Sequence, residues 1–382
     1  MRATVAASAG RRASAARSRS CRERNREPRR ASGGPDAPLL RSGVEPKPAW
    51  QTIPRSVRAE TESLLGARVA RATRAWGGYS PTPTYRLRLA DGRRAFFKAV
   101  GPSDNEFARL AHSRELRVYR ELAGPIGPWA PAFLGTIEVG PWSAMLLEDL
   151  GPKCAPPWTD GLARRVTRSL ASFHRSTLGA TLPDWLPRPE RHLLTDARMW
   201  RLAVDPTWLR NVAALAGALA GDALRWLEAH APALAGWATI LRGLDEPMAL
   251  VHRDVRSDNL RWVDGRVRLL DWPHVGVGPV EDDAVIFVQS VKAEGGPDPE
   301  SLIAAYAEVM PVRPDVLGGA VSSVAAFFAD QAWRPEIPGL PRLRAFQRRQ
   351  LQVSLAWASR LLGLPEPTWL GAIGRDRSQP GI

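Results

Sequence analysis

The chain has 382 residues, of which 44% are hydrophobic and 24% charged, and a formal net charge of +14. This length and composition allow a large buried core, so an enzyme of one large or two medium domains fits. Its two cysteines, Cys21 and Cys154, have no CxxC or Cys/His cluster beside them, which argues against disulfides and structural zinc. No apolar stretch approaches the length of a membrane span and no signal-peptide core follows the first Met, so we expect a cytoplasmic protein without a membrane partner.

Much of the positive charge lies in the first 50 residues, which hold twelve Lys or Arg against four acids, whereas the remainder holds 41 against 35. Residues 1–48 are mainly Arg, Ser, Ala, Gly and Pro, so they cannot offset the entropy of ordering by burial. We predict a disordered tail, whose composition also fits a wrongly chosen start, a transit peptide or a nucleic-acid arm. Apart from nonspecific contact by this basic tail, we expect no nucleic-acid partner and no obligate protein partner.

From Trp50 onward the apolar pattern becomes regular and begins with a short amphipathic helix that includes Ile53 and Val57. Between the first two predicted strands, Gly77 and Gly78 form a tight turn that lets the backbone approach a ligand. The pattern predicts five strands and one long helix in a small N-terminal domain over residues 49–150. The predicted strands are 68–74, 84–89, 94–100, 133–139 and 143–148, and the helix is 105–123.

Beyond Gly151 the chain is predicted to be almost wholly helical, with one strand cluster at 248–271. We therefore expect an α+β fold with a larger, mainly helical domain over residues 151–365 and a flexible C-terminus over 366–382. The predicted helices are 160–178, 208–219, 222–243, 281–293, 299–309, 314–333 and 341–363.

The clearest chemical pattern lies in the strand cluster. An apolar strand leads into His252-Arg253-Asp254, Asn259 follows five residues after that Asp, and Asp271 ends the next hairpin. Phosphoryl transfer needs a divalent metal to neutralise phosphate oxygens and a carboxylate at the acceptor hydroxyl, and these groups supply both. A polar hairpin with solvated carboxylates is the alternative, but chance rarely places these residue types in this order and at these separations.

This segment resembles the catalytic and metal-binding loops of the kinase superfamily. The resemblance implies that Asp254 orients or deprotonates the acceptor hydroxyl, that Asn259 and Asp271 bind Mg²⁺, and that His252 braces the loop from behind. It also implies a bilobal protein-kinase-like fold. A small five-stranded antiparallel N-lobe would bind ATP or GTP, and a larger helical C-lobe would carry the catalytic loop and the acceptor pocket.

A lysine in the third strand extends the resemblance. Lys98 stands inside an otherwise apolar strand, where an unpaired ammonium would be costly, so it needs an anionic partner. The resemblance assigns Glu115 of the following helix as the partner that directs Lys98 to the α- and β-phosphates, with Glu121 as the alternative. It also matches the end of the fifth strand to the kinase hinge, so Glu148 and Leu150 are candidate backbone contacts for adenine.

The residues after Asp271 distinguish protein kinases from small-molecule kinases. Protein kinases carry a long activation segment that ends in Ala-Pro-Glu, but here Asp283, at the start of an apolar helix, follows Asp271 after only twelve residues. This arrangement resembles the aminoglycoside phosphotransferase family, in which an Asp matched by Asp283 caps the helix and supports the catalytic loop. Arg253, where the family usually has Gly, and Trp272-Pro273 are departures from the family pattern.

The resemblance implies transfer of a γ-phosphate to a hydroxyl of a small molecule. A polycationic aminoglycoside would favour an acidic acceptor site, yet residues 291–382 hold ten Lys or Arg against nine acids. The aromatic residues Trp333, Phe346, Phe327 and Phe328 either belong to the core or line an acceptor pocket. The acceptor is therefore aminoglycoside-like or another hydroxylated metabolite. The alternative is a nucleotide-binding pseudokinase without turnover, although every group expected of an active enzyme is present.

Overall fold

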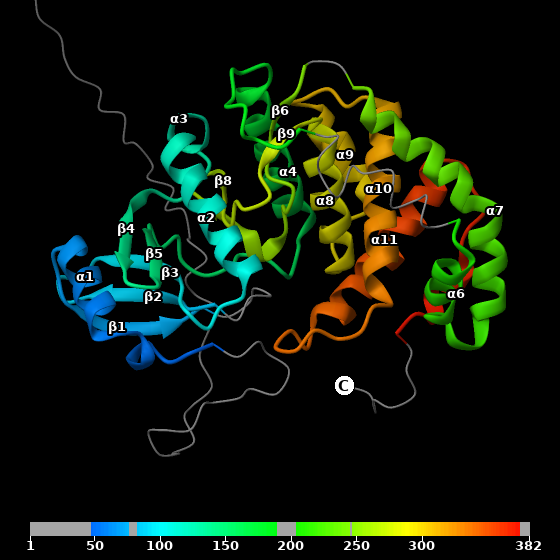
Figure 1. Ribbon diagram of the computed structural model, residues 1–382. Helices are drawn as coiled ribbons and strands as arrows, with labels where there is room; N and C mark the ends of the chain where they lie inside the picture. The colour runs from blue at the N-terminus through cyan, green and yellow to red at the C-terminus, as the bar shows by residue number, and fades with distance from the viewer. Residues whose placement is uncertain (1–46, 76–81, 189–203, 245–246, 375–382) are drawn as a thin grey trace, which may run out of the picture. The chain divides into compact units, whose positions relative to one another are not determined.

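The computed structural model describes residues 47–75, 82–188, 204–244 and 247–374 (Figure 1). Its first part is an antiparallel sheet of five strands in the order β1-β2-β3-β5-β4, preceded by helix α1 (Arg55–Leu65). The five predicted strands are all present, each within one residue of the expected bounds. They are β1 (Val69–Arg74), β2 (Thr84–Leu89), β3 (Arg94–Val100), β4 (Phe133–Val139) and β5 (Trp142–Leu147).

Strand β3 lies in the middle of this sheet, and its register fixes the position of Lys98. Lys98 pairs with Thr84 of β2 on one side and with Met145 of β5 on the other. Its sequence neighbours Phe97 and Ala99 point to the opposite face, where they join a small hydrophobic core formed by α1 and the sheet. The face that carries Lys98 is the one that helix α2 (Glu106–Glu121) contacts. A short helix, α3 (Ala123–Ile126), follows α2.

Every helix predicted in the second part is present, although the bounds of two helices differ most from the prediction. The helix expected over 208–219 begins at Pro206, because Asp205 caps it by accepting hydrogen bonds from the next residues, and it ends at Ala214. The helix expected over 222–243 continues from residue 239 as a 3-10 turn. No helix in the described ranges is long and apolar enough to cross a membrane. The helices are α4 (Asp160–Thr177), α6 (Pro206–Ala214), α7 (Ala220–Ala238), α8 (Val280–Ala293), α9 (Pro299–Ala307), α10 (Pro314–Ala332) and α11 (Leu343–Leu361).

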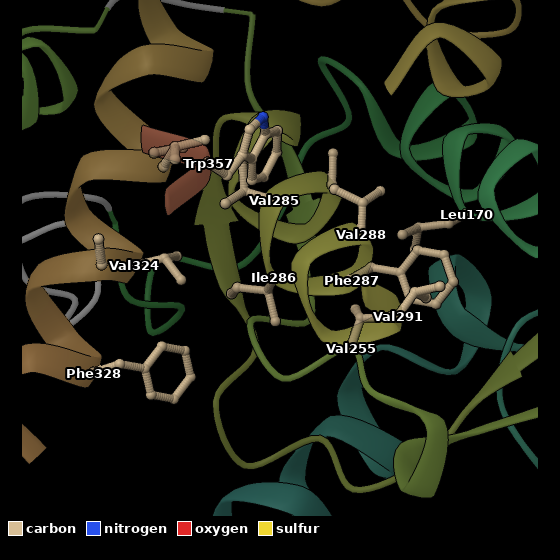
Figure 2. Close-up of a cluster of buried hydrophobic side chains, with 14 of the residues drawn as sticks. Leu170, Val255, Val285, Ile286, Phe287, Val288, Val291, Val324, Phe328 and Trp357 are labelled. Atoms are coloured by element: carbon tan, nitrogen blue, oxygen red, sulfur yellow. The ribbon is translucent and has the colours of Figure 1, made fainter. Parts of the chain in front are cut away.

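Helix α8 forms the centre of the larger hydrophobic core. Every residue of α8 except Lys292 is buried, and α4, α9, α10 and α11 pack against it. Figure 2 shows apolar side chains, among them Val285 and Phe287, projecting from this helix into the core. Val255, from the loop that follows β6 (Ala249–Val251), belongs to the same core (Figure 2). The loop that carries Asp254 is therefore anchored on a helix that is almost wholly buried.

Two short antiparallel pairs bring the chemically interesting segments together. Strand β6 pairs with β9 (Gly276–Gly278), and β7 (Leu260–Val263) pairs with β8 (Arg266–Leu269). The turn between β7 and β8 uses Asp264 and Gly265, whose φ angles of 50° and 74° suit a tight primed turn. Strand β9 was not predicted, because three residues of which two are glycines give no apolar alternation to detect.

The last described segment corrects one prediction. We expected a flexible C-terminus from residue 366, but Thr368–Ala372 forms a 3-10 helix in which Trp369 and Leu370 are buried. The side chain of Gln352 on α11 donates hydrogen bonds to the carbonyls of Leu370 and Ile373. Burial of a tryptophan and two hydrogen bonds hold this segment against the helices.

Candidate active site

Lys98 lies between two carboxylates that come from distant parts of the chain. Its Nζ is 2.5 Å from Glu115 Oε2 and 2.7 Å from Asp271 Oδ1. Burial disfavours the ammonium, but Asp271 and Glu115 outweigh it and raise the pKa of Lys98. Burial also disfavours ionised Asp271, but Lys98 outweighs it and lowers the pKa of Asp271 to about 2. The alternative partner Glu121 instead pairs with Arg117, so the geometry favours Glu115.

Asp254 sits in a dense polar loop after β6. Asn259 Nδ2 donates to Asp254 Oδ2 at 2.7 Å and to the Asp254 carbonyl at 3.0 Å. Arg256 Nε lies 3.0 Å from Asp254 Oδ1. Burial raises the pKa of Asp254 to about 7, although Arg256 opposes the shift. A carboxyl group that titrates near neutral pH is suited to take a proton from a hydroxyl.

Asp283, in the first turn of α8, supports this loop through its backbone. Its carboxylate accepts the N–H groups of His252 at 2.6 Å and of Arg253 at 2.5 Å. It also lies 3.1 Å from Nε2 of His174, whose Nδ1 is 2.5 Å from the hydroxyl of Tyr306. All of these groups are buried, so the start of the loop is held by a connected polar network. Sequence analysis found Asp283 but not His174, because a lone His on an apolar helix gives no signal.

His252 connects the loop to the end of β8. Its Nε2 is 2.9 Å from the Leu270 carbonyl, and its Nδ1 is 3.3 Å from the Asp254 N–H. One donor and one acceptor partner define a neutral ring protonated at Nε2. Burial lowers the pKa of His252 to about 4, which keeps the ring neutral. These contacts fit a brace between the two loops.

Arg253 precedes Asp254 in the same loop, and its side chain is fully buried. Its φ angle is 62°. Its guanidinium donates to the carbonyls of Val277 at 3.0 Å and Pro187 at 3.4 Å, and its Nε is 3.7 Å from Asp282 Oδ2. A Cβ atom on Gly276 would overlap this guanidinium. Sequence analysis noted Arg253 only as a departure from the family. The glycines of β9 were the available signal, since they make room for it.

Helix α8 also holds the second half of the loop. Ser257 Oγ donates to Glu294 Oε1 at 2.6 Å, and Trp158 Nε1 donates to Glu294 Oε2 at 2.7 Å. Glu294 directly follows α8 as its C-cap, whereas Asp283 stands in the first turn of the helix. One buried helix therefore fixes both ends of the segment that carries Asp254. Sequence analysis did not identify Glu294, because nothing in the local pattern links positions 257 and 294.

The two candidate hinge residues follow β5. The N–H of Glu148 donates to the Ala132 carbonyl at 2.9 Å, so this N–H is already paired within the protein. Among the described residues, none makes a backbone hydrogen bond with Leu150. The Gly151 carbonyl next to it accepts from Nη2 of Arg86 and, at 3.1 Å, from Nε of Arg261. The other predicted nucleotide contacts, Gly77 and Gly78, lie outside the described residues.

Asn259 and Asp271 supply oxygen donors that fit a hard cation. Because Asn259 directs its Nδ2 at Asp254, its Oδ1 faces away from that carboxylate. The Leu270 N–H donates to the Asn259 carbonyl at 2.8 Å, which holds the backbone just before Asp271 beside Asn259. Mg²⁺ in such sites takes one or two protein oxygens and completes its shell with water and phosphate oxygens. The described ranges contain no group of three or more His, Cys, Asp or Glu that could hold a metal ion.

The aromatic residues of the late helices are divided between the core and the site. Phe328 is buried and contacts both Phe327 and Phe346, with ring centroids 5.2 and 6.2 Å apart. The ring of Phe346 also lies 5.0 Å from Cζ of Arg256. Trp333 packs against the core. Among the described residues, Phe346 is therefore the one of these four whose ring contacts the loop that carries Asp254.

Known proteins give a consistent comparison. Residues 71–317 match the phosphotransferase enzyme family. The fold is similar to that of an aminoglycoside phosphotransferase from Alicyclobacillus acidocaldarius, with a TM-score of 0.57 and 13% identity, covering 81% of this chain and 96% of that one. A choline kinase from Streptococcus pneumoniae gives a TM-score of 0.49 and 12% identity, covering 80% of this chain and 98% of that one. No curated protein matches the chain significantly. The predicted protein-kinase-like α+β fold is confirmed.

Proposed function

Because the chain belongs to the phosphotransferase enzyme family, we propose that it transfers the γ-phosphate of ATP or GTP to a hydroxyl group of a small molecule. The observation that carries the proposal is the meeting of Lys98 with both Glu115 and Asp271, beside the loop of Asp254 and Asn259. Phosphoryl transfer depends mainly on positioning and charge, and this cluster provides a cation, candidate metal ligands and a proton acceptor.

The nucleotide would lie between β3 and the loop. Lys98, aimed by Glu115, binds the α- and β-phosphates, and the carbonyl of Glu148 with the backbone of Leu150 holds the base. Asn259 and Asp271 would hold Mg²⁺, which supplies neutralising charge for the phosphate oxygens. When the nucleotide enters, Lys98 exchanges part of its contact with Asp271 for phosphate oxygens.

Asp254 acts on the acceptor. Its carboxylate accepts the hydrogen bond of the attacking hydroxyl and takes its proton as the new oxygen–phosphorus bond forms. The bond between the γ-phosphorus and the β,γ-bridging oxygen breaks in the same step, and ADP or GDP leaves. Asn259 orients the carboxylate through its 2.7 Å hydrogen bond to Oδ2, and His252 and Asp283 keep the loop in place without touching the substrate. The acceptor is a hydroxylated metabolite or an aminoglycoside-like compound, and we expect the reaction in the cytoplasm.

The test is Mg²⁺-dependent consumption of ATP and GTP by the purified protein, with aminoglycosides, choline, homoserine, amino sugars and macrolides as acceptors. We expect Asp254→Asn to lower kcat by a factor of about 10² to 10⁴ without loss of folding, because it removes the proton acceptor and keeps the shape. The matched control is Asp298→Asn, which alters an exposed carboxylate paired with Lys292.

Three outcomes separate the alternatives. Turnover in Asp254→Asn equal to that of the wild type would overturn the assigned mechanism. A rise in melting temperature with MgATP, without turnover on any compound, would mean that the acceptor lies outside the panel or that the protein is a pseudokinase. Failure of the wild type to bind any nucleotide would reject the proposed function.

A further inference from the structure

Arg256 occupies the space beside Asp254 and belongs to none of the roles assigned above. Its Nε is 3.0 Å from Asp254 Oδ1, and its Nη2 is 3.1 Å from Asp258 Oδ2. The side chain is 14% exposed, so the guanidinium is largely but not fully enclosed. This cation therefore contacts the carboxylate assigned to the acceptor and remains partly open to solvent.

Phe346 of α11 lies against this guanidinium. The aromatic centroid lies 5.0 Å from Cζ of Arg256, within the range of a cation–π contact. An arginine in such a contact still has N–H donors that can bind anions. Asp254 and Asp258 are two such anions in contact with it, and both lie in the loop that the substrate must approach.

The transferring phosphoryl group must come close to the same point. A hydroxyl that donates to Asp254 lies about 3 Å from the carboxylate. In a near-attack geometry the phosphorus lies about 3 to 3.5 Å beyond that hydroxyl. A change of the Arg256 rotamer would thus bring its guanidinium from Asp254 to the γ-phosphate oxygens. Lys98 is already paired with Glu115 and Asp271.

We propose that Arg256 is a further catalytic residue, whose guanidinium, seated on Phe346, binds the γ-phosphate and stabilises the charge of the transferring phosphoryl group. The assignment rests on the proposed function. In the free protein the two carboxylates hold the guanidinium, and the γ-phosphate replaces part of that contact when the nucleotide binds. An arginine is well suited to this, since it presents several donors in one plane to phosphate oxygens.

Binding of two nucleotides tests the assignment without knowledge of the acceptor. Dissociation constants for AMP-PNP, which has a γ-phosphoryl group, and for ADP, which lacks one, are measured with Mg²⁺ by calorimetry. In Arg256→Ala the Kd for AMP-PNP should rise about tenfold or more, while the Kd for ADP changes less than about threefold. Millimolar guanidinium should restore the affinity of this variant for AMP-PNP. Phe346→Leu, which removes the aromatic seat but keeps an apolar side chain, should give a smaller loss that is selective in the same way.

The control is Arg360→Ala, which removes an exposed arginine of the same helix α11 that pairs with Glu300. Both dissociation constants should stay unchanged in it. Arg256→Gln keeps the length and hydrogen-bonding capacity without the charge, and it replaces the alanine variant if that variant does not fold. Equal changes in the two affinities, or no change in either, would overturn the role of Arg256. Wild-type protein that binds neither nucleotide would instead overturn the proposed function.

Discussion

Replacement of Asp283 by alanine should destabilise the protein severely, although Asp283 touches no substrate. Its buried carboxylate accepts hydrogen bonds from the N–H groups of His252 and Arg253 and from His174. Hydrogen bonds to a charged acceptor contribute about 1.5 to 3 kcal/mol each, and removal of one partner leaves the others buried and unsatisfied. These contributions are not additive, so we expect a loss of about 4 kcal/mol. Since a whole domain is stable by only about 5 to 15 kcal/mol, this is a large fraction.

Urea denaturation measured by tryptophan fluorescence checks this value. The midpoint should fall in Asp283→Ala with little change in m, whereas Asp298→Asn should shift the free energy of unfolding by less than about 0.5 kcal/mol. Burial disfavours ionised Asp283, but His174 and the backbone donors outweigh it and lower its pKa. Its contribution is therefore complete above the unfolded-state pKa and is lost as the pH falls toward the folded-state value. A loss of less than about 1 kcal/mol in Asp283→Ala at neutral pH would refute the structural role assigned to this network.

Two further predictions concern packing and pH. Gly276→Ala should cost about 1 to 3 kcal/mol in calorimetry, because its Cβ would overlap the buried guanidinium of Arg253, while Gly236→Ala in the open face of α7 should be neutral or stabilising. Equal stability of both variants would contradict the tight packing. Because burial raises the pKa of Asp254 to about 7, turnover should fall as the pH drops below that value, and the stability supplied by this group should be lost as the pH rises through it. An ATP-consumption profile without an acidic limb near pH 7 would exclude Asp254 as the proton acceptor.

The sequence was sufficient to predict those features whose residues all lie within one short segment of the chain. The five strands followed from alternation, and Asp254, Asn259 and Asp271 followed from residue types at fixed separations. An anionic partner for Lys98 could be anticipated because a cation inside an apolar strand demands an anion, and the resemblance to the kinase superfamily singled out Glu115 over Glu121.

The parts that sequence reasoning missed depend on contacts between distant segments. The roles of Arg253 and Glu294 are visible only once β9 and the end of α8 are placed beside the loop. Similarly, nothing in the sequence distinguishes Arg256 from other arginines. Its contact with Phe346, ninety residues away, is visible only in the fold. Burial of Trp369 against the helices was hidden for the same reason. Tertiary contacts, and not local propensity, decide these positions.

The two hydrophobic cores imply that the parts of this protein open with different free energies. The sheet has a small core of its own, whereas the loop of Asp254 is fastened to α8 inside the large one. In hydrogen exchange, we expect the amides of α8 to be among the slowest in the protein and those of the edge strand β1 to exchange through local opening. The sheet could then fluctuate and admit a nucleotide while the catalytic loop stays folded. Each turnover would then begin with the loop of Asp254 already in its folded conformation.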